Sequence, residues 1–283
     1  MQQSGNYVTN PYLITAISNI HAGSGDANYG VIDKEVQRDV ISQLPTIHAS
    51  GLKGAFRELF THLHDGDPDH NNITYIFGSS NSEQKGDTNK NEAGWYNFYN
   101  AQLLVLPVRS DKAPFFRATS PEILKEFRRQ LQHFNKDKYD QYESALKALI
   151  DINPEENEPV FFEGYGEAIL EDYLAKEIDF PDGIYDLTLD LLGENLALFH
   201  HNDFKILCED LPVIARNNLE NGISTNLWYE EIVPRESRFF FFLSQPQEHS
   251  GFDTTLRLNN DFVQIGANAS VGYGYSKITK LGE

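Results

Sequence analysis

The sequence predicts an α+β fold, and three observations support this prediction. Segments typical of strands alternate with segments typical of amphipathic helices. The first strand, residues 12–20, has apolar residues on both faces, and the last strand, residues 275–279, is also central in character. Residues 239–243 include four consecutive phenylalanines, which must lie inside a sheet because such an edge strand invites aggregation. At 283 residues and 40% hydrophobic content, the chain suits one elaborated domain or two small ones.

The other elements follow from local patterns. Residues 50–63 predict a helix with a buried stripe formed by Leu52, Phe56, Leu59, Phe60 and Leu63. Residues 65–91 are polar except at 73–77, and we expect a long mobile loop there. A strand is predicted at 102–108, and Ser120-Pro121-Glu122 begins a helix that continues to about Phe134. A further helical period covers 139–150, and the strand at 262–265 flanks a glycine-rich loop together with 275–279.

A β-hairpin is predicted in the region 210–234. Residues 211–216 and 223–232 form its strands, residues 217–222 its turn, and Asn221-Gly222 is the turn signal. Pro212 and Pro234 mark the two feet. From the residues alone, an ordinary surface hairpin is the preferred interpretation.

Charge is distributed unevenly along the chain. The net charge of −19 argues against a general nucleic-acid binder, whose surface is normally basic. Residues 151–195, however, contain fourteen carboxylates against one cation, Lys176, so that −13 of the −19 lies in one segment. Screening over about 10 Å lets a remote acidic face coexist with a local cationic groove. We expect this segment to be a solvated face, and the alternative is that it repels RNA from one side of an assembly.

Composition also limits the cellular setting. Cys208 is the single cysteine, so no internal disulfide can form, and a buried inert thiol is expected. No apolar run is long enough to span a bilayer, and the N-terminus lacks the pattern of a signal peptide. We therefore expect a cytoplasmic protein with no membrane partner.

The stretch 20–57 carries the clearest functional signal. A strand runs into the glycine turn Gly23-Ser24-Gly25, a loop carries Asp33, and a helix begins with small residues and has Lys53 and Arg57 four positions apart. Free N–H groups at a helix start bind phosphate, and the two cations add to this. The pattern predicts a surface for a polyanion with a carboxylate beside it.

Five ordered blocks make the chain resemble the RAMP superfamily, and specifically the repeated backbone subunit of type III-B (Cmr) CRISPR effectors. They are residues 20–57, Ile76-Phe77-Gly78 with Ala93-Gly94, residues 103–110 ending in Pro-Val-Arg-Ser, residues 227–231, and residues 263–266 with 271–274. The chain departs from the family at Ala267 and Tyr273, where Gly and Arg are usual, and at Asn100, where Asp is common. At Tyr273, an aromatic ring would then replace a phosphate contact.

The resemblance implies a ferredoxin-like (RRM-like) RAMP core over residues 1–283, with a polar insertion at about 65–92 and an acidic helical insertion at about 137–198. The hairpin then becomes the thumb, which opens a guide–target duplex at regular intervals. Its expected residues are Arg216, Asn217, Asn218, Leu219 and Trp228. The implied RNA-binding residues are His48, Ser50, Lys53, Arg57, Arg109, Gly266, Asn268, Ser270, Gly272, Tyr273 and Gly274.

Asp33 matches the catalytic aspartate of the family. The resemblance implies an antiviral endoribonuclease that cuts guide-paired target RNA with a divalent ion, Mg²⁺ or Mn²⁺, transiently at Asp33 and with no organic cofactor. The alternative for Asp33 is a loop-capping residue. His21 either assists proton transfer, which is the lesser option, or orders the loop or contacts RNA. The histidines and aspartates at 62–70 have ligand chemistry but no fixed spacing, so a solvated loop is expected there.

The implied partners are crRNA, target RNA, further copies of the chain and other Cmr subunits, including the large polymerase/cyclase-like subunit and the small helical subunit. Two rival functions remain open. One is a non-catalytic backbone subunit that only binds guide RNA, and the other is a RAMP guide-processing endonuclease that works through a histidine.

Overall fold

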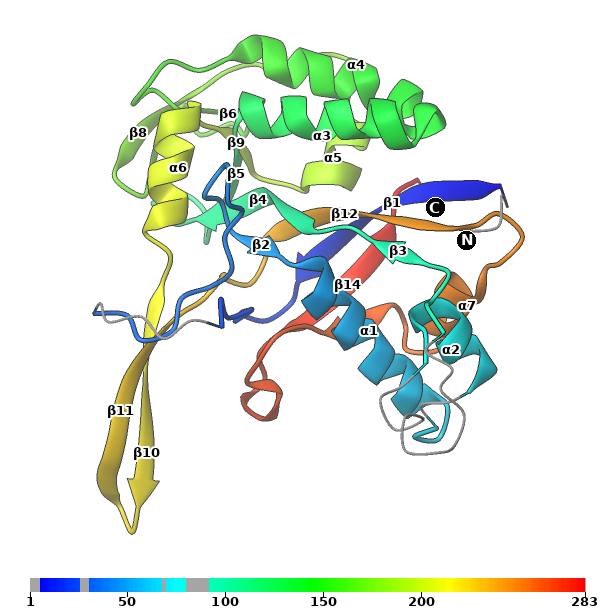
Figure 1. The fold of residues 1–283 in the computed structure, drawn as a ribbon. Helices are drawn as coiled ribbons and strands as arrows, with labels where there is room; N and C mark the ends of the chain where they lie inside the picture. Colours follow the sequence, from blue (N-terminus) through cyan, green and yellow to red (C-terminus); the bar gives the residue numbers. More distant parts are fainter. Residues whose placement is uncertain (1–5, 26–30, 68–69, 80–91, 283) are drawn as a thin grey trace.

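A four-stranded antiparallel sheet forms the centre of the molecule (Figure 1). The computed structural model describes residues 6–25, 31–67, 70–79 and 92–282. The strands β1 (Tyr7–Ala16), β4 (Ala101–Val108), β12 (Arg238–Pro246) and β14 (Tyr275–Lys280) lie in the order β14-β1-β12-β4. Helix α1 (Ala49–Leu63) follows β1, and α7 (Gly251–Arg257) follows β12. This is the split βαβ arrangement, so the predicted ferredoxin-like core is confirmed.

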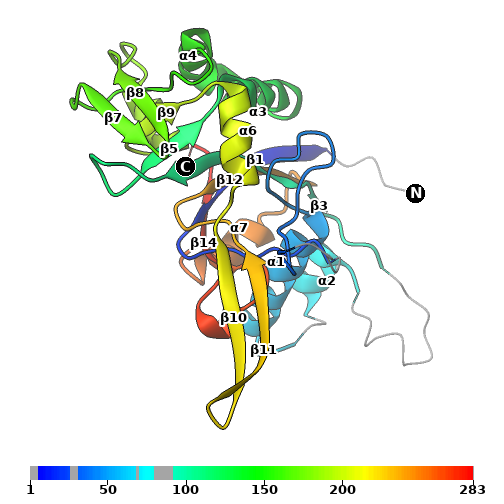
Figure 2. The ribbon, with the colours of Figure 1, turned by 90° about the vertical axis from the view of Figure 1, so that its left-hand side faces the viewer.

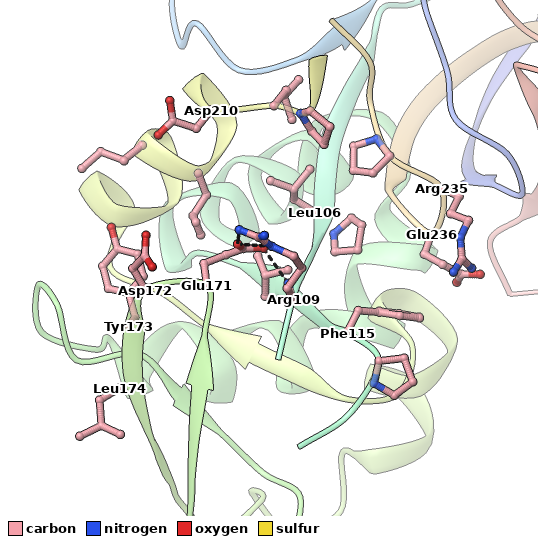
Figure 3. A pocket seen from close by; sticks show the side chains of 18 of the residues that line it. Leu106, Arg109, Phe115, Glu171, Asp172, Tyr173, Leu174, Asp210, Arg235 and Glu236 are labelled. Carbon is pink, nitrogen blue, oxygen red and sulfur yellow. Dashed lines mark hydrogen bonds and ion pairs between the residues drawn. The ribbon is translucent and has the colours of Figure 1, made fainter. Parts of the chain in front are cut away.

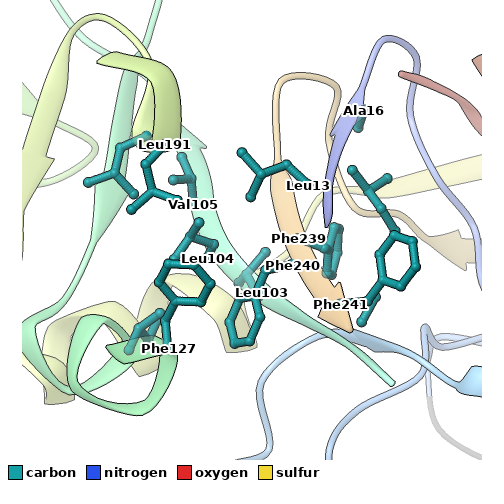
Figure 4. Close-up of a cluster of buried hydrophobic side chains, with 14 of the residues drawn as sticks. Leu13, Ala16, Leu103, Leu104, Val105, Phe127, Leu191, Phe239, Phe240 and Phe241 are labelled. Carbon is teal, nitrogen blue, oxygen red and sulfur yellow. The ribbon is translucent and has the colours of Figure 1, made fainter. Parts of the chain in front are cut away.

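The phenylalanine run of β12 is covered on both faces, which confirms the predicted interior strand. The Phe241 ring stacks on Tyr12 at 5.2 Å and lies 6.0 Å from Phe56 of α1. On the other face, Phe240 lies 4.7 Å from Phe127, a residue of α3 (Pro121–Phe134). Alternate side chains of one strand therefore hold two helical layers together, and Figure 4 shows part of this cluster.

Short elements extend the core. β2 (Thr46–Ile47) pairs with β4, β3 (Asn97–Phe98) pairs with β12, and β13 (Phe262–Gln264) pairs with β14. The 3-10 turn η2 (Ala269–Val271) lies in the glycine-rich loop between β13 and β14. The two closing strands therefore flank that loop as predicted.

The predicted loop at 65–91 is wrong in part, because α2 (Asn71–Phe77) is a helix with Ile73, Ile76 and Phe77 buried. Residues 68–69 and 80–91 of this region lie outside the described residues. Gly78 bridges Ala93 directly after α2. A Cβ on Gly78 would lie 2.6 Å from the Glu92 carbonyl oxygen, so this close backbone approach requires glycine.

The acidic segment contains strands as well as helices, which corrects the expectation of a helical insertion. The helices are α4 (Lys136–Ile152), α5 (Tyr185–Leu192) and, after the segment, α6 (His201–Glu209). The strands of the insertion are β6 (Val160–Phe161), β7 (Glu167–Leu170), β8 (Tyr173–Glu177) and β9 (Leu196–Leu198), and β5 (Phe116–Thr119) precedes it. These strands continue the sheet from β4 in the order β4-β5-β9-β6-β8-β7. Each has at most five residues, and apart from the β7–β8 hairpin they pair with strands distant in the chain, so local patterns did not indicate them.

The predicted hairpin is present and projects away from the core (Figure 2). Its strands are β10 (Val213–Glu220) and β11 (Ile223–Glu231). Asn221 and Gly222 both have positive φ, 52° and 81°, as a two-residue type I′ turn requires. The expected six-residue turn is therefore wrong, since residues 217–220 belong to β10.

Three further expectations concern Ser120, Cys208 and membrane-spanning helices. Ser120 precedes α3 as its N-cap residue, but its Oγ lies 3.2 Å from His201 Nδ1 and makes no capping bond. Cys208 is buried, and burial raises the pKa of its thiol. Within the described part of the chain, no helix combines the length and apolar character needed to cross a bilayer.

The packing of β12 gives a stability prediction. Phe241→Ala should lower the free energy of unfolding by about 3–5 kcal/mol, because it leaves a cavity between Tyr12 and Phe56. Urea denaturation followed by circular dichroism measures this change. Ile223→Ala, at an exposed thumb position, is the control and should change stability by less than about 0.5 kcal/mol. Equal effects of the two variants would contradict the central role of β12.

Candidate nucleic-acid interface

The loop after β1 lies against the foot of the thumb. Asp33 N–H and Lys34 N–H both donate to the Tyr229 carbonyl, at 3.1 and 3.2 Å, and Glu231 N–H donates to the Lys34 carbonyl at 2.9 Å. Ile20 forms a further antiparallel bridge with Val233. The backbone of the loop is therefore paired with β11 and its continuation.

Asp33 is exposed at this junction. Its Oδ2 accepts a 2.7 Å hydrogen bond from Tyr229 N–H, which lies 196 positions away in the chain. Asp33 also lines a pocket of about 640 Å³ together with His21, Glu230, Ala267 and other residues. The observed bond is a long-range one to the thumb, in contrast to the local cap that was the alternative interpretation.

His21 is 2% exposed and lies at the centre of three segments. Its Nδ1 is 2.7 Å from the Glu231 carbonyl oxygen, and its own carbonyl accepts from Ala267 N–H at 2.9 Å. A Cβ on Gly266 would overlap the His21 carbonyl oxygen, so Gly266, with φ +87°, is required for this approach. These contacts agree with the interpretation in which His21 orders the loop.

Glu230 connects the loop after β1, the thumb and the glycine-rich loop. It was not among the residues expected to form the site. Its carboxylate is 1% exposed and accepts four hydrogen bonds. The donors are Lys34 Nζ at 3.0 Å, Arg216 Nε at 3.1 Å, Trp228 Nε1 at 2.8 Å and Asn268 Nδ2 at 2.8 Å. The available signal was its place in the block 227–231, but its donors come from distant segments.

The electrostatics of Glu230 favour the charged form. Burial alone would raise its pKa, but hydrogen bonds from Trp228 and Lys34, the Lys34 charge and the Arg216 bond lower the pKa to about 2. The neighbouring Glu231 is also buried and bonds to Arg38 Nη2 at 2.5 Å and to Val36 N–H at 2.9 Å. Two adjacent carboxylates thus attach the loop to the thumb.

Predicted thumb and loop residues come together around Glu230. The Arg216 guanidinium lies 4.4 Å from the centre of the Tyr273 ring, and Lys34 Nζ lies 5.1 Å from the Trp228 ring. Asn217 and Asn218 lie further along the thumb, where Asn217 Oδ1 accepts from Ser224 Oγ at 2.7 Å. Leu219 occupies a strand position beyond them, at a β-bulge.

The glycine-rich loop supplies backbone and small side chains. Gly272 and Gly274 have positive φ, and Gly274 N–H donates to the Asn19 carbonyl at 2.8 Å. Ser270 is exposed, and Asn268 is in the left-handed region with φ +65°. The glycine-rich loop is therefore anchored by Gly274 to the segment after β1 and by Asn268 to Glu230.

The two cations of α1 do not line the groove that α1 shares with the glycine-rich loop. That groove, of about 970 Å³, is lined by Gly51, Gly54 and Gly266 among other residues. At 3.6 residues per turn, Arg57 and Lys53 lie roughly 130–170° around the helix from the middle of its lining face. Arg57 instead donates to the Gly78 carbonyl at 3.1 Å and to the Ser79 carbonyl at 3.4 Å. Lys53 and Arg57 therefore lie on a different surface of α1 from the one that faces the glycine-rich loop.

The other residues at the start of α1 have mixed positions. Burial and the nearby Arg57 lower the pKa of Lys53. His48 is the N-cap residue and donates its N–H to Gln37 Oε1 at 2.7 Å, whereas Ser50 is exposed. Asn100 Oδ1 accepts from Ala49 N–H at 2.9 Å. The amide at position 100 thus supplies an acceptor to the helix start, as an aspartate would.

Arg109 is separate from this site. It lies at the end of β4, where its Nε donates to Glu171 Oε2 at 2.7 Å and its backbone N–H donates to Glu171 Oε1 at 2.7 Å (Figure 3). Its expected role in RNA binding is not supported by this position, because its charge is paired with the acidic segment.

The described residues contain no group of three or more His, Cys, Asp or Glu side chains suited to hold a metal ion. In the segment 62–70, the His64 and His70 rings stack at 4.0 Å, and His70 Nδ1 accepts from Asn72 N–H at the start of α2. At Asp33, one exposed carboxylate faces an open pocket. It suits a cation that arrives with a phosphate and keeps most of its water, and it does not suit a resident metal.

Glu230 gives a prediction with a defined pH dependence. Glu230→Gln should lower the free energy of unfolding at pH 7 by about 2–4 kcal/mol, because it leaves Lys34 and Arg216 without their shared charge. The folded-state pKa is depressed, so this stability is present above the unfolded pKa of about 4.5 and is lost as pH falls toward about 2. The difference in unfolding free energy between wild type and variant should therefore become smaller as the pH is lowered from 5 to 3.

Urea denaturation followed by Trp228 fluorescence in a Trp95→Phe background measures this difference. Glu220→Gln, at an exposed position near the tip of the same hairpin, is the control and should show no such difference. A difference that stays constant with pH would contradict the assigned role of Glu230.

Curated relatives are similar to this chain over almost its whole length. The CRISPR system Cmr endoribonuclease Cmr4 of Pyrococcus furiosus is 26% identical, with 96% of this chain and 95% of the relative covered. The CRISPR system CMR subunit Cmr4 of Saccharolobus solfataricus is 25% identical, with 96% of both chains covered.

Solved structures show the same fold. A chain of a type III-B Cmr-beta complex in the apo state matches with a TM-score of 0.78, 22% identity and 98% coverage of both chains. Oligomeric Cmr4 from Pyrococcus furiosus matches with a TM-score of 0.66, 20% identity and coverage of 96% of this chain and 98% of that one. The family model of the RAMP superfamily matches residues 13–277. The chain therefore belongs to the RAMP superfamily.

Proposed function

We propose that this protein is the backbone subunit of a type III-B CRISPR effector that binds guide RNA and cleaves the paired target RNA once per subunit through Asp33, in antiviral defence. The similarity to two Cmr4 proteins along nearly the full length supports the subunit assignment. One relative is named an endoribonuclease, and related chains occur in a Cmr-beta complex bound to cognate target RNA and in an oligomeric Cmr4. Other Cmr subunits, including the large polymerase/cyclase-like and small helical subunits, are the further proposed partners.

One observation carries the cleavage proposal. Asp33 is held at the foot of the thumb by Tyr229 N–H, in a pocket that also contains residues of the glycine-rich loop. A nucleotide displaced from a duplex by the thumb would therefore lie near an exposed carboxylate. The backbone anchors at 229 and 231 reduce the freedom of the loop, so little ordering remains to be done when RNA binds.

The proposed reaction is attack of a 2′-hydroxyl on the adjacent phosphorus. It forms a cyclic phosphate on one product and releases a 5′-hydroxyl on the other. Asp33 accepts the 2′-hydroxyl proton, or it would hold a divalent cation, Mg²⁺ or Mn²⁺, which would supply stabilisation of the developing negative charge. His21 acts as a positioning residue, because it is buried and bonds to the Glu231 carbonyl.

Asp33→Asn tests the chemistry without releasing the loop. An asparagine at 33 still offers an oxygen to Tyr229 N–H but is a poor base and a weak cation ligand. In a complex reconstituted with guide RNA, cutting should fall at least about 100-fold. Target affinity should stay within about twofold, because many phosphate contacts determine it. Cutting by the wild-type complex should require a divalent cation. A target with 2′-deoxy substitution at the cleavage positions should bind and stay uncut.

Asp39→Asn is the matched control in the same loop. The Asp39 carboxylate accepts from Ile41 N–H and Ser42 N–H and faces its own turn. This variant should cut at the wild-type rate. Unchanged cutting by both variants would assign the nuclease to another residue or subunit.

Shortening the thumb tests the proposed opening of the duplex. Deletion of residues 218–219 and 224–226 removes paired tip residues and leaves 220–223 as the turn. The core should stay folded, since these residues make a separate two-stranded sheet. Regularly spaced products should become irregular or disappear on a sequencing gel. The same product ladder would show that the thumb does not set the spacing.

The two rivals make different demands on the site. A backbone subunit that only binds guide RNA is favoured if Asp33→Asn has no effect. A histidine-based guide-processing enzyme needs an accessible imidazole, and His21 is 2% exposed with Nδ1 bonded to the thumb foot. This burial favours the aspartate-based proposal.

A further inference from the structure

A third hollow lies at the feet of the thumb, and Arg109 is the only proposed RNA contact among its lining residues. We call it the lobe groove. It has a volume of about 920 Å³ and lies between the end of β4, the β7–β8 turn, α6 and the prolines at the thumb feet (Figure 3). A hollow of this size accepts a short stretch of another molecule.

The walls of the lobe groove expose apolar side chains. Leu174 of β8 is 54% exposed and Ile206 of α6 is 48% exposed, while Leu106 and Leu211 of the same lining are buried. Both exposed residues sit on short elements that are fixed by sheet pairing and by helix packing. Exposed apolar side chains that line a hollow on rigid supports are typical of a contact surface.

The rim of the groove is negative. Four carboxylates line it against two guanidiniums, and Arg109 is already paired with Glu171. Asp172 and Asp210 are exposed and make no ion pair with any described residue. They lie at the end of the groove opposite to Arg235 (Figure 3).

The phenol of Tyr173, which lines the groove, experiences the negative potential of these carboxylates. Burial and the charges of Asp203, Asp172 and Asp210 raise the pKa of Tyr173. RNA is disfavoured here because its phosphates would meet these carboxylates. The unpaired carboxylates of the rim favour an occupant that brings basic side chains to them.

We propose that the lobe groove is a docking site for a basic segment of a partner protein. Apolar side chains of that segment contact Leu174 and Ile206, and its lysine or arginine side chains pair with Asp172 and Asp210. Apolar contact provides most of the affinity, while the charges select a basic partner over RNA and other acidic proteins. This proposal does not depend on the assignment of Asp33.

The test uses the purified full-length chain and three fluorescent probes. The first is a twelve-residue peptide of alternating lysine and leucine that carries a benzophenone, the second replaces lysine by glutamate, and the third is a twelve-nucleotide single-stranded RNA. Fluorescence anisotropy should show binding of the basic peptide at least tenfold tighter than the acidic peptide. After irradiation, mass spectrometry should place the cross-link within residues 171–174 or 206–213.

Two pairs of charge reversals separate a site from general acidity. Asp172→Lys combined with Asp210→Lys should weaken binding of the basic peptide at least tenfold. Asp179→Lys with Asp182→Lys changes the net charge equally at exposed positions outside the groove and should leave binding within about twofold. Ile206→Ser should also weaken binding, with the salt dependence unchanged.

Several results would overturn the proposal. They are equal losses in the two charge-reversed pairs, cross-links elsewhere on the chain, no binding of the basic peptide, or RNA bound at the groove more tightly than the peptide. Self-association that is abolished by Ile206→Ser would assign the groove to a second copy instead. Circular dichroism of each variant verifies that the fold is intact before binding is compared.

Discussion

The candidate site depends on one buried carboxylate. Glu230 accepts hydrogen bonds from the loop after β1, from both thumb strands and from the glycine-rich loop, so it fixes three segments relative to one another. Removing a charge from water is costly, and four donors with two cations offset that cost. Because the Lys34 and Arg216 charges are used for this purpose, neither is a free phosphate ligand. Part of the positive charge expected of a nucleic-acid interface is therefore used to hold the site together.

Local patterns were sufficient where an element is stabilised by its own sequence. The start of α3 follows from the proline at its first position, the extent of α1 from its apolar periodicity, and the interior place of β12 from its phenylalanines. Patterns failed where distant segments decide the structure. α2 is a helix of seven residues, and its Asn72 bonds to Thr255 of α7, 183 positions away. The four donors to Glu230 are likewise gathered from distant segments, so their convergence has no local signature.

The placement of charge explains how an acidic chain can hold a site for a polyanion. The acidic segment adds strands to the far side of β4, whereas Asp33 and the glycine-rich loop lie beside β11 and beyond β14. Arg109 shows the consequence at a single residue, because its position at the end of β4 places it beside Glu171 of the acidic segment. A cation in a matching motif is thus paired with a carboxylate from the insertion packed against it.

The two carboxylates nearest the thumb foot have opposite environments, and this difference separates structural from chemical roles. A carboxylate that organises a site must be buried and fully bonded, which describes Glu230 and keeps its pKa near 2. A carboxylate that takes a proton or meets a cation must keep one side open to solvent, which describes Asp33 with its single bond to Tyr229 N–H. Tyr229, whose backbone N–H bonds to Asp33, directly precedes Glu230 in β11, and Lys34, which bonds to Glu230, directly follows Asp33. The buried and the exposed carboxylate therefore belong to the same junction of loop and thumb, where the first serves its structure and the second the proposed chemistry.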